Sequence, residues 1–188
     1  MAPPSALPHI TTKWTLFLDR DGVINEPPEH LYARNWQEFH FCKGSLEALR
    51  IVSTLFGRVI IVTNQQGIGK GLMREEDLSL IHKYMCREIE QAGGDIDAVY
   101  SCPALEEEEH PERKPNPGMA HRACEDFPEI DMKRSVMVGD KRNDIAFGQN
   151  LSMYTVLITM NSNIQANADF HFSSLFGFAK CIQQIVGT

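Results

Sequence analysis

The chain has 188 residues, of which 43% are hydrophobic and 23% charged, and its formal net charge is −7. This composition is typical of a folded globular protein, and the length predicts a single domain. The acidic balance disfavours stable nucleic-acid binding, and the longest aliphatic run, Val59–Val62, is far short of the roughly 20 residues that span a membrane.

Strand-like and helix-like segments alternate along most of the chain. Residues 1–12 contain three prolines and no periodicity, so we expect a flexible tail there and one domain over residues 13–188. Beyond the tail, short apolar runs predict strands at Trp14–Leu18, Val59–Val62, Ile96–Tyr100, Val136–Val138 and Tyr154–Ile158. Amphipathic stretches predict helices at Gly44–Leu55, Glu75–Ala92, Pro117–Phe127 and Ser174–Val186. This alternation predicts an α/β fold, with a three-layer Rossmann-like parallel sheet covered by helices on both faces.

The cysteines and the N-terminus bear on location. Five cysteines, an odd number without CxxC spacing, are typical of reduced thiols rather than of a disulfide framework. The first 13 residues contain no apolar stretch that would act as a secretory signal. We therefore expect a cytoplasmic protein.

Polar residues follow the predicted strands directly. Asp19 and Asp21 come after the first strand, Thr63, Asn64 and Gln65 end or follow the second, and Asp140 follows the fourth. Lys114 lies between the third and fourth strands. Because ligands of parallel sheets bind beyond the carboxyl ends of the strands, we expect these side chains to gather at one edge.

Asp19 and Asp21 have the spacing of a nucleophile and its acid/base partner. A carboxylate attacks phosphorus in enzymes that form an aspartyl-phosphate, and a second carboxyl can protonate the leaving alcohol. Two acids so close repel each other, which raises the pKa of one and keeps it protonated. The alternative is a solvated Asp-x-Asp-Gly turn after a strand.

Asp140 favours the catalytic interpretation. Together with Asp19 it offers the oxygen ligands that Mg²⁺ prefers. Asp144 is expected near a helix start, where it would bind the metal's water, orient Lys114 or simply be exposed. Lys141 is expected at the metal site or on the plain surface.

Three further residues suit a phosphate group. The hydroxyl of Thr63 and the backbone amides after it can hold a phosphoryl oxygen, and Lys114 can balance its negative charge. Arg113 can bind a second anionic or hydroxylated part of the substrate. The alternative for Arg113 and Lys114 is a pair of surface cations.

Four motifs resemble those of the haloacid-dehalogenase superfamily: FLDRDGV, VTNQ, RKPNPGM and VGDKRND, in that order between Trp14 and Ile158. The nearest branch contains heptose-bisphosphate and histidinol-phosphate phosphatases. The resemblance implies Asp19 as nucleophile, Asp21 as acid/base, Thr63 and Lys114 steadying the phosphoryl group, and Mg²⁺ at Asp19, Asp21 and Asp140. It also implies that Arg113 recognises the substrate, alongside Asn64 and Gln65 after the second strand.

Two departures from the superfamily concern access to the site. The intervals from Asp21 to Thr63 and from Thr63 to Lys114 each hold only a core helix and strand, so we expect no substantial cap domain and specificity from short loops such as Glu26–Trp36. The zinc loop of this branch retains only Cys102 and His110 as possible ligands, so we expect no zinc. The Glu106–Glu109 run is expected to be solvated, or else to disfavour doubly anionic substrates and favour one that carries an amine.

The sequence therefore predicts a Mg²⁺-dependent phosphomonoester hydrolase that forms an aspartyl-phosphate and acts on a small phosphorylated metabolite. The resemblance implies a sugar or polyol phosphate, first D-glycero-D-manno-heptose 1,7-bisphosphate and alternatively histidinol phosphate. A polynucleotide 3′-phosphatase would need a basic groove. A non-catalytic phosphate- or metal-binding module would have lost Asp19 or Asp21, and both are present.

Overall fold

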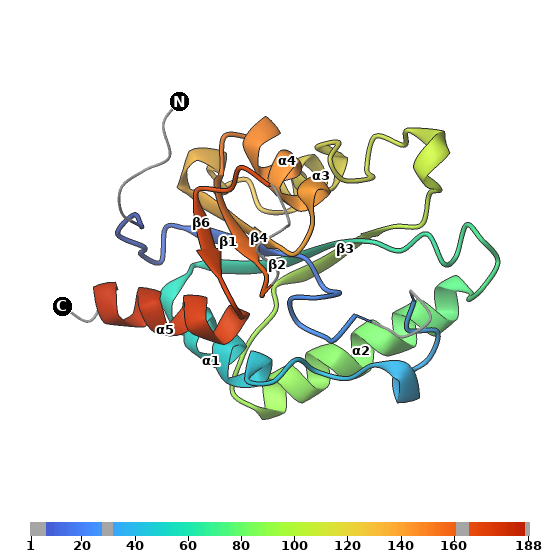
Figure 1. Cartoon of the computed structure of the whole chain (residues 1–188), viewed down its shortest axis with the longest axis horizontal. Coiled ribbons are helices and arrows are strands. Elements are labelled where there is room, and N and C mark those ends of the chain that lie inside the picture. The colour runs from blue at the N-terminus through green and yellow to red at the C-terminus, as the bar shows by residue number, and fades with distance from the viewer. Residues whose placement is uncertain (1–6, 28–31, 161–165, 187–188) are drawn as a thin grey trace.

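The computed structural model describes residues 7–27, 32–160 and 166–186. In these ranges one six-stranded sheet with five α-helices forms the fold (Figure 1). The strands are β1 (Thr15–Leu18), β2 (Arg58–Asn64), β3 (Ala98–Cys102), β4 (Ser135–Gly139), β5 (Tyr154–Ile158) and β6 (Phe170–Phe172). The helices are α1 (Ser45–Leu55), α2 (Glu75–Gln91), α3 (Gly118–Asp126), α4 (Arg142–Asn150) and α5 (Leu175–Val186). The predicted α/β parallel-sheet fold is confirmed.

The order of the strands creates a crevice at the carboxyl edge of the sheet. The order is β3-β2-β1-β4-β5-β6, and every neighbouring pair is parallel. Strands β2 and β3 therefore lie on one side of β1, and β4, β5 and β6 lie on its other side. Ligands of such sheets bind where the order reverses, beyond the carboxyl ends of the two central strands. Here those ends lead into Asp19 and Asp140.

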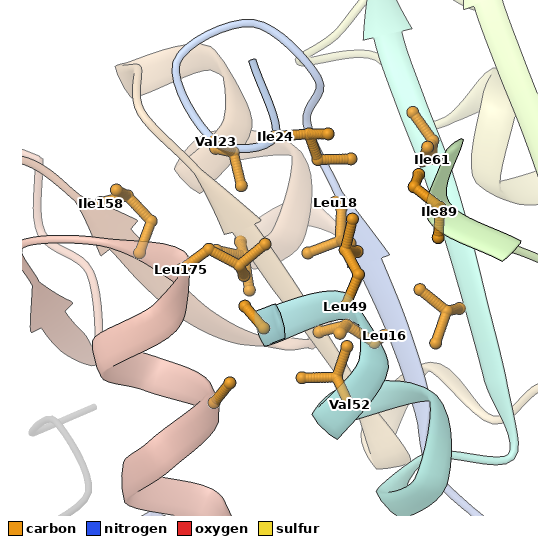
Figure 2. Close-up of a cluster of buried hydrophobic side chains, with 14 of the residues drawn as sticks. Leu16, Leu18, Val23, Ile24, Leu49, Val52, Ile61, Ile89, Ile158 and Leu175 are labelled. Carbon is orange, nitrogen blue, oxygen red and sulfur yellow. The ribbon is translucent and has the colours of Figure 1, made fainter. Parts of the chain in front are cut away.

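Alternate side chains of the central strands are buried in two separate hydrophobic cores on opposite faces of the sheet. Leu16 and Leu18 point to the larger core, which contains residues of α1, α2 and α5 (Figure 2). Phe17 points to the smaller core, which contains residues of α3 and α4. In Figure 1 the three helices α1, α2 and α5 accordingly lie on one side of the sheet and α3 and α4 on the other. Because both faces are buried, the strands consist of nearly continuous apolar runs.

The structure differs from the sequence prediction at several boundaries. Strand β6 was not predicted, and β3 begins two residues later than expected. The tail prediction for residues 1–12 lies partly outside the described residues, but Ile10 is buried in the larger core. The division into tail and domain stays a prediction.

The described connections near the carboxyl edge are short. Between β1 and β2 they form a turn, a single 3₁₀ turn at Trp36–Glu38 and α1, and between β2 and β3 they form turns and α2. No inserted domain occurs in these described stretches, although residues 28–31 of the predicted specificity loop lie outside them. In the same ranges no helix has the length and apolar composition needed to cross a membrane.

Two leucines test the burial on which this fold depends. Leu16 is fully buried in the larger core, whereas Leu80 of α2 is 49% exposed. Leu16→Ala should lower the free energy of unfolding by about 2–5 kcal/mol, because it leaves a cavity that the sheet cannot fill. Leu80→Ala should change it by less than about 0.5 kcal/mol. Urea denaturation of both variants measures the difference, and equal losses would contradict the described core.

Candidate active site

A tight turn after β1 places the two aspartates of the first motif. The amide of Asp19 still donates to the carbonyl of Val138 at 2.9 Å, so this residue is held as an extension of the sheet. The chain then reverses through Gly22, whose φ is +88°. A side chain at Gly22 would also overlap the carboxylate of Asp140. Glycine is therefore required here both for the backbone conformation and for the close approach of Asp140.

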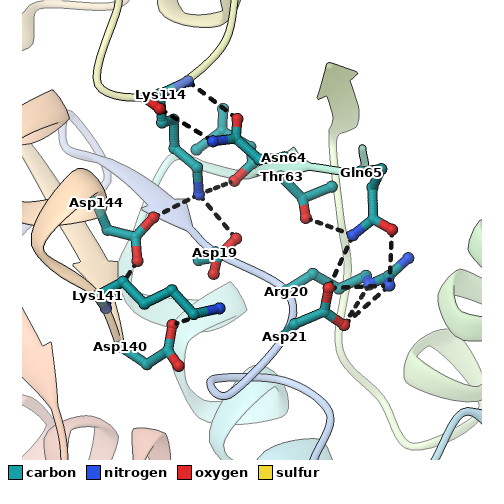
Figure 3. A network of polar contacts seen from close by, with 11 residues as sticks. Asp19, Arg20, Asp21, Thr63, Asn64, Gln65, Lys114, Asp140, Lys141 and Asp144 are labelled. Carbon is teal, nitrogen blue, oxygen red and sulfur yellow. Dashed lines mark hydrogen bonds and ion pairs between the residues drawn. The ribbon is translucent and has the colours of Figure 1, made fainter. Parts of the chain in front are cut away.

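Lys114 joins the elements of the site through a buried ammonium group. Its Nζ lies 2.8 Å from Oδ1 of Asp19 and 2.6 Å from Oδ1 of Asp144, and the three side chains are 2%, 7% and 3% exposed, respectively (Figure 3). Nζ also donates to the carbonyl of Val62 at 2.7 Å. These contacts occupy all three donors of the ammonium group. Of the predicted roles for Asp144, the contact with Lys114 is the one that the geometry shows.

Asn64 fixes the backbone of the loop that carries Lys114. Its amide nitrogen donates to the carbonyl of Lys114, and its Oδ1 accepts from the Lys114 amide, both at 3.0 Å. The side-chain amide of Asn64 thus makes two reciprocal hydrogen bonds with the Lys114 backbone, as a paired residue does in a β-sheet. The side chain that was predicted to bind substrate therefore also holds the lysine in place.

Three carboxylates form a group that suits a divalent cation. Oxygen atoms of Asp19, Asp140 and Asp144 all lie within 4.8 Å of one another. Oδ1 of Asp140 is buried and has no hydrogen-bond partner, since the Lys141 ammonium lies 3.6 Å away. A buried carboxylate oxygen without a partner is costly, and a hard cation such as Mg²⁺ would satisfy it. The residues present therefore fit the predicted metal.

The crowding of these acids raises two pKa values. Burial, together with the nearby charge of Asp144, raises the pKa of Asp19 to about 6 despite the opposing effect of Lys114. Burial and the charges of Asp19 and Asp144 raise the pKa of Asp140 to about 7, against the effect of Lys141. A bound cation would reverse both shifts, because it stabilises the charged form.

Asp21 lies apart from this group and has the opposite electrostatic environment. Its carboxylate is turned toward Arg20 and Gln65 in Figure 3, and it also accepts a hydrogen bond from Asn25 at 2.9 Å. Although burial opposes the shift, the Arg20 guanidinium and these hydrogen bonds lower the pKa of Asp21. The expectation that repulsion keeps the acid/base residue protonated is therefore wrong. Of the two aspartates, Asp19 has the raised pKa.

A cavity of about 410 Å³ opens over the predicted residues. This volume suits a small metabolite. Six predicted residues line it: Asp19, Asp21, Asn64, Arg113, Lys114 and Asp140. Thr63 and Gln65 do not, because both side chains are buried behind the cavity, where they hydrogen-bond to each other at 2.9 Å. The predicted roles of Thr63 at the phosphoryl group and of Gln65 in substrate binding stay predictions.

The cavity also has lining residues that the sequence analysis did not name individually, although Tyr32 belongs to the predicted specificity loop Glu26–Trp36. They include Tyr32 and Lys70, whose hydroxyl and ammonium groups are 3.2 Å apart. Glu106 lines the cavity as well, and the Glu106–Glu109 run is exposed, as was expected. Arg20 and Asn25, which hold Asp21, are fully buried and were also missed. Arg20 lies within the FLDRDGV motif, but residue type alone favours the surface for both, since buried arginine and asparagine are rare.

The two possible zinc ligands before Arg113 lie close together. The Cys102 thiol lies 3.6 Å from Nδ1 of His110. Among the described residues, the aspartate group is the one place where three or more possible metal ligands come together. The expectation of no zinc stays a prediction.

Comparisons with known proteins agree with these motifs. The HAD-hydrolase-like family model matches residues 112–171. The chain is 32% identical to D-glycero-alpha-D-manno-heptose-1,7-bisphosphate 7-phosphatase of Mycobacterium bovis, with 90% of this chain and 92% of that protein covered. It is 35% identical to the Campylobacter jejuni protein of the same name, with 85% and 90% covered.

A solved structure extends the likeness to three dimensions. The D,D-heptose 1,7-bisphosphate phosphatase from B. bronchiseptica, complexed with magnesium and phosphate, superimposes with a TM-score of 0.79 at 26% identity. The match covers 91% of this chain and 98% of that one.

The raised pKa of Asp140 predicts a pH-dependent effect on stability. Folding raises the pKa of Asp140 from 3.8 to about 7, so the folded state favours the protonated carboxyl. The resulting contribution to the free energy of unfolding is fully present below pH 3.8 and is lost as the pH rises to about 7. In the presence of chelator, wild type should therefore lose stability relative to Asp140→Asn across this interval, because asparagine never ionises. With Mg²⁺ present, wild type should have the higher free energy of unfolding of the two proteins near neutral pH. Urea titrations of both proteins measure it, and a constant difference across the pH series would contradict the assignment.

Proposed function

This chain belongs to the HAD-like hydrolases and is a phosphatase, and we propose that it removes the 7-phosphate of D-glycero-D-manno-heptose 1,7-bisphosphate. The observation that carries the proposal is the buried contact of Lys114 with Asp19 at the crevice between β1 and β4. The similarity of this chain to heptose-bisphosphate phosphatases over most of its length supports the choice of substrate.

The cavity has groups suited to the two ends of such a substrate. The aspartate group lies at one part of its lining, and the cationic side chains of Arg113 and Lys70 line it as well. A guanidinium group can bind a phosphate through two parallel hydrogen bonds. These cations would recognise the phosphate that is retained while the other is transferred.

In the proposed reaction, a carboxylate oxygen of Asp19 attacks the phosphorus of the 7-phosphate. The bond from phosphorus to the C7 oxygen breaks, and Asp21 gives a proton to that oxygen from its protonated form, which its lowered pKa makes the minor form near neutral pH. Water then attacks the phosphorus of the aspartyl-phosphate while Asp21 takes up a proton from it. The bond from phosphorus to the Asp19 oxygen breaks, which frees the carboxylate and releases inorganic phosphate. Lys114 holds the Asp19 carboxylate in one orientation throughout and offsets its negative charge.

Mg²⁺ is the cofactor that suits the three clustered aspartates. Asp19, Asp140 and Asp144 are the residues whose carboxylates would hold it directly or through water. When bound, the cation neutralises negative charge on the phosphoryl oxygens. Asp21 was also predicted to bind it, but its carboxylate is engaged by Arg20, Asn25 and Gln65.

Histidinol phosphate is the second candidate substrate, favoured by the carboxylate of Glu106 in the cavity lining. Such a group would bind the ammonium group of histidinol phosphate and repel a second phosphate. The two candidates therefore differ in whether Glu106 or the pair Arg113 and Lys70 recognises the distal part of the substrate.

Assays with both substrates test the proposal. We expect kcat/KM for a heptose 1,7-bisphosphate anomer to exceed that for histidinol phosphate by at least about 100-fold, roughly 2.7 kcal/mol of transition-state binding. Both anomers of the bisphosphate should be measured, since curated relatives are named for each. A preference for histidinol phosphate that Glu106→Gln abolishes would establish the second candidate instead.

The nucleophile is tested by substitution and by trapping. Asp19→Asn should reduce hydrolysis to less than about 1% of wild type, because an amide does not attack phosphorus. Circular dichroism and thermal melting control for folding. Rapid acid quenching of wild type with ³²P-labelled substrate should leave label on a peptide that contains Asp19. Label-free protein, or appreciable turnover by Asp19→Asn, would indicate direct attack by water.

Metal removal distinguishes a Mg²⁺ site at the three aspartates from a structural zinc site at Cys102 and His110. Chelation should stop hydrolysis without unfolding the protein, and Mg²⁺ alone should restore activity, because the ligands are hard oxygens. A structural zinc would behave differently, since its removal costs folding free energy. Metal analysis of the purified protein and melting curves before and after chelation provide the measurement. About one zinc per chain would contradict the prediction for Cys102 and His110.

A further inference from the structure

Arg20 lies between the two aspartates of the first motif, and its side chain is completely buried. Arginine is almost never fully buried unless its charge is paired. Burial of a cation costs several kcal/mol, so a surface position would be the default for this residue. Its contacts therefore have to explain why the guanidinium group lies inside the protein.

The guanidinium group of Arg20 binds the carboxylate of the next residue, Asp21. Nη2 of Arg20 lies 2.9 Å from Oδ1 and 3.2 Å from Oδ2 of Asp21, and Nε lies 3.2 Å from Oδ1. Successive residues of a strand point to opposite faces, so this pairing needs the tight turn that follows. The carbonyl of Arg20 accepts amide hydrogen bonds from Val23, Ile24 and Asn25, which close that turn.

Gln65 reinforces the same arrangement from β2's side of the site. Its Oε1 accepts from Nη2 of Arg20 at 3.2 Å, and its Nε2 donates to Oδ2 of Asp21 at 2.8 Å. Asn25 donates to Oδ1 of Asp21. Asn25 and Gln65 each supply one bond to the carboxylate, and Arg20 alone contacts both of its oxygens. The plane of the Asp21 carboxylate is thus fixed mainly by the guanidinium group.

His82 of α2 holds the other end of the guanidinium group. Nη1 of Arg20 lies 3.1 Å from Nε2 of His82. Because arginine only donates hydrogen bonds, Nε2 must be the acceptor, which leaves the proton of the neutral imidazole on Nδ1. Burial and the adjacent guanidinium lower the pKa of His82 to about 3, in keeping with a neutral ring. Phe39 covers the group, with its ring centroid 5.8 Å from Cζ.

We propose that Arg20 is a positioning residue that aims the Asp21 carboxylate at the leaving oxygen, and that His82 orients Arg20 for this task. The inference rests on the acid/base role proposed for Asp21. Neither Arg20 nor His82 lines the cavity, so both act through Asp21 and without touching substrate. Helix α2 thereby contributes to proton transfer from outside the cavity.

The test compares two substrates that differ in their need for a proton. The heptose bisphosphate has an alkoxide leaving group, whereas 4-nitrophenyl phosphate releases a phenolate that needs little protonation. Asp21→Asn provides the reference for complete loss of the acid. Arg20→Lys keeps the charge but loses the planar fork. His82→Leu removes the acceptor for Nη1, and His82→Gln retains one. Lys83→Leu, at an exposed position of the same helix, is the matched control.

Selective loss of kcat/KM on the alkyl substrate is the expected signature, because kcat/KM reports the transfer to Asp19 and not the later hydrolysis step that both substrates share. Asp21→Asn should lose about 100-fold or more on the heptose bisphosphate and far less on the aryl ester. Arg20→Lys and His82→Leu should lose at least about tenfold in kcat/KM on the alkyl ester alone. His82→Gln should recover most of the loss, and Lys83→Leu should match wild type. A merely structural role would lower both activities together.

Nuclear magnetic resonance tests the Arg20–His82 link without an assay. The ¹⁵N shifts of His82 in wild type should show a protonated Nδ1 and an unprotonated Nε2 throughout roughly pH 5–8. A protonated Nε2 would overturn the link. This spectrum and the His82 variants decide the matter if Arg20→Lys does not fold.

The outcomes distinguish this inference from the proposed function. Equal losses on both esters for Asp21→Asn would remove Asp21 from proton transfer, and the positioning role would fall with it. A selective Asp21→Asn combined with unselective Arg20→Lys and His82→Leu would leave the proposed function intact and overturn the positioning role alone.

Discussion

The buried ammonium group of Lys114 is the contact on which the rest of the site depends. It binds carboxylates that come from two different parts of the fold, Asp19 after β1 and Asp144 in α4. Without it, two buried negative charges would face each other at the crevice, and removing one partner from a buried charge network costs about 3–5 kcal/mol. The backbone clamp from Asn64 and the contact with the Val62 carbonyl follow from the same need, because they fix the lysine where both acids can reach it.

The sequence predicted the fold well where burial is complete and poorly where it is partial. The central strands have apolar side chains on both faces, which gives runs that are easily recognised. Strand β6 has only three residues, Phe170–Phe172, lies at the edge of the sheet and is largely half-buried or exposed, so its pattern is weak. The early start predicted for β3 has a different cause. Ile96 packs against the core although it precedes the strand, so its apolar character does not mark the strand's first residue.

The candidate site was predictable to the extent that it depends on topology. Because all strands are parallel, residues that follow them meet at one edge, and this argument placed Asp19, Asn64, Lys114 and Asp140 correctly around one cavity. It could not show which way each side chain turns. The orientation of Asp21 and the burial of Gln65 are set by a local turn and by Arg20, whose contact with His82 joins residues far apart in the sequence. Such contacts leave no spacing pattern to find.

Asp144 makes two contacts with different parts of the chain. One oxygen contacts Lys114, and the other accepts the amide of Lys141 at the start of α4. The beginning of this helix and the loop around Lys114 are therefore fastened to the same carboxylate. Fluctuations that expose one of these segments must also release the other, so the two behave as one cooperative unit of local unfolding. Hydrogen exchange at the amide of Lys141 thus reports how firmly Lys114 is held.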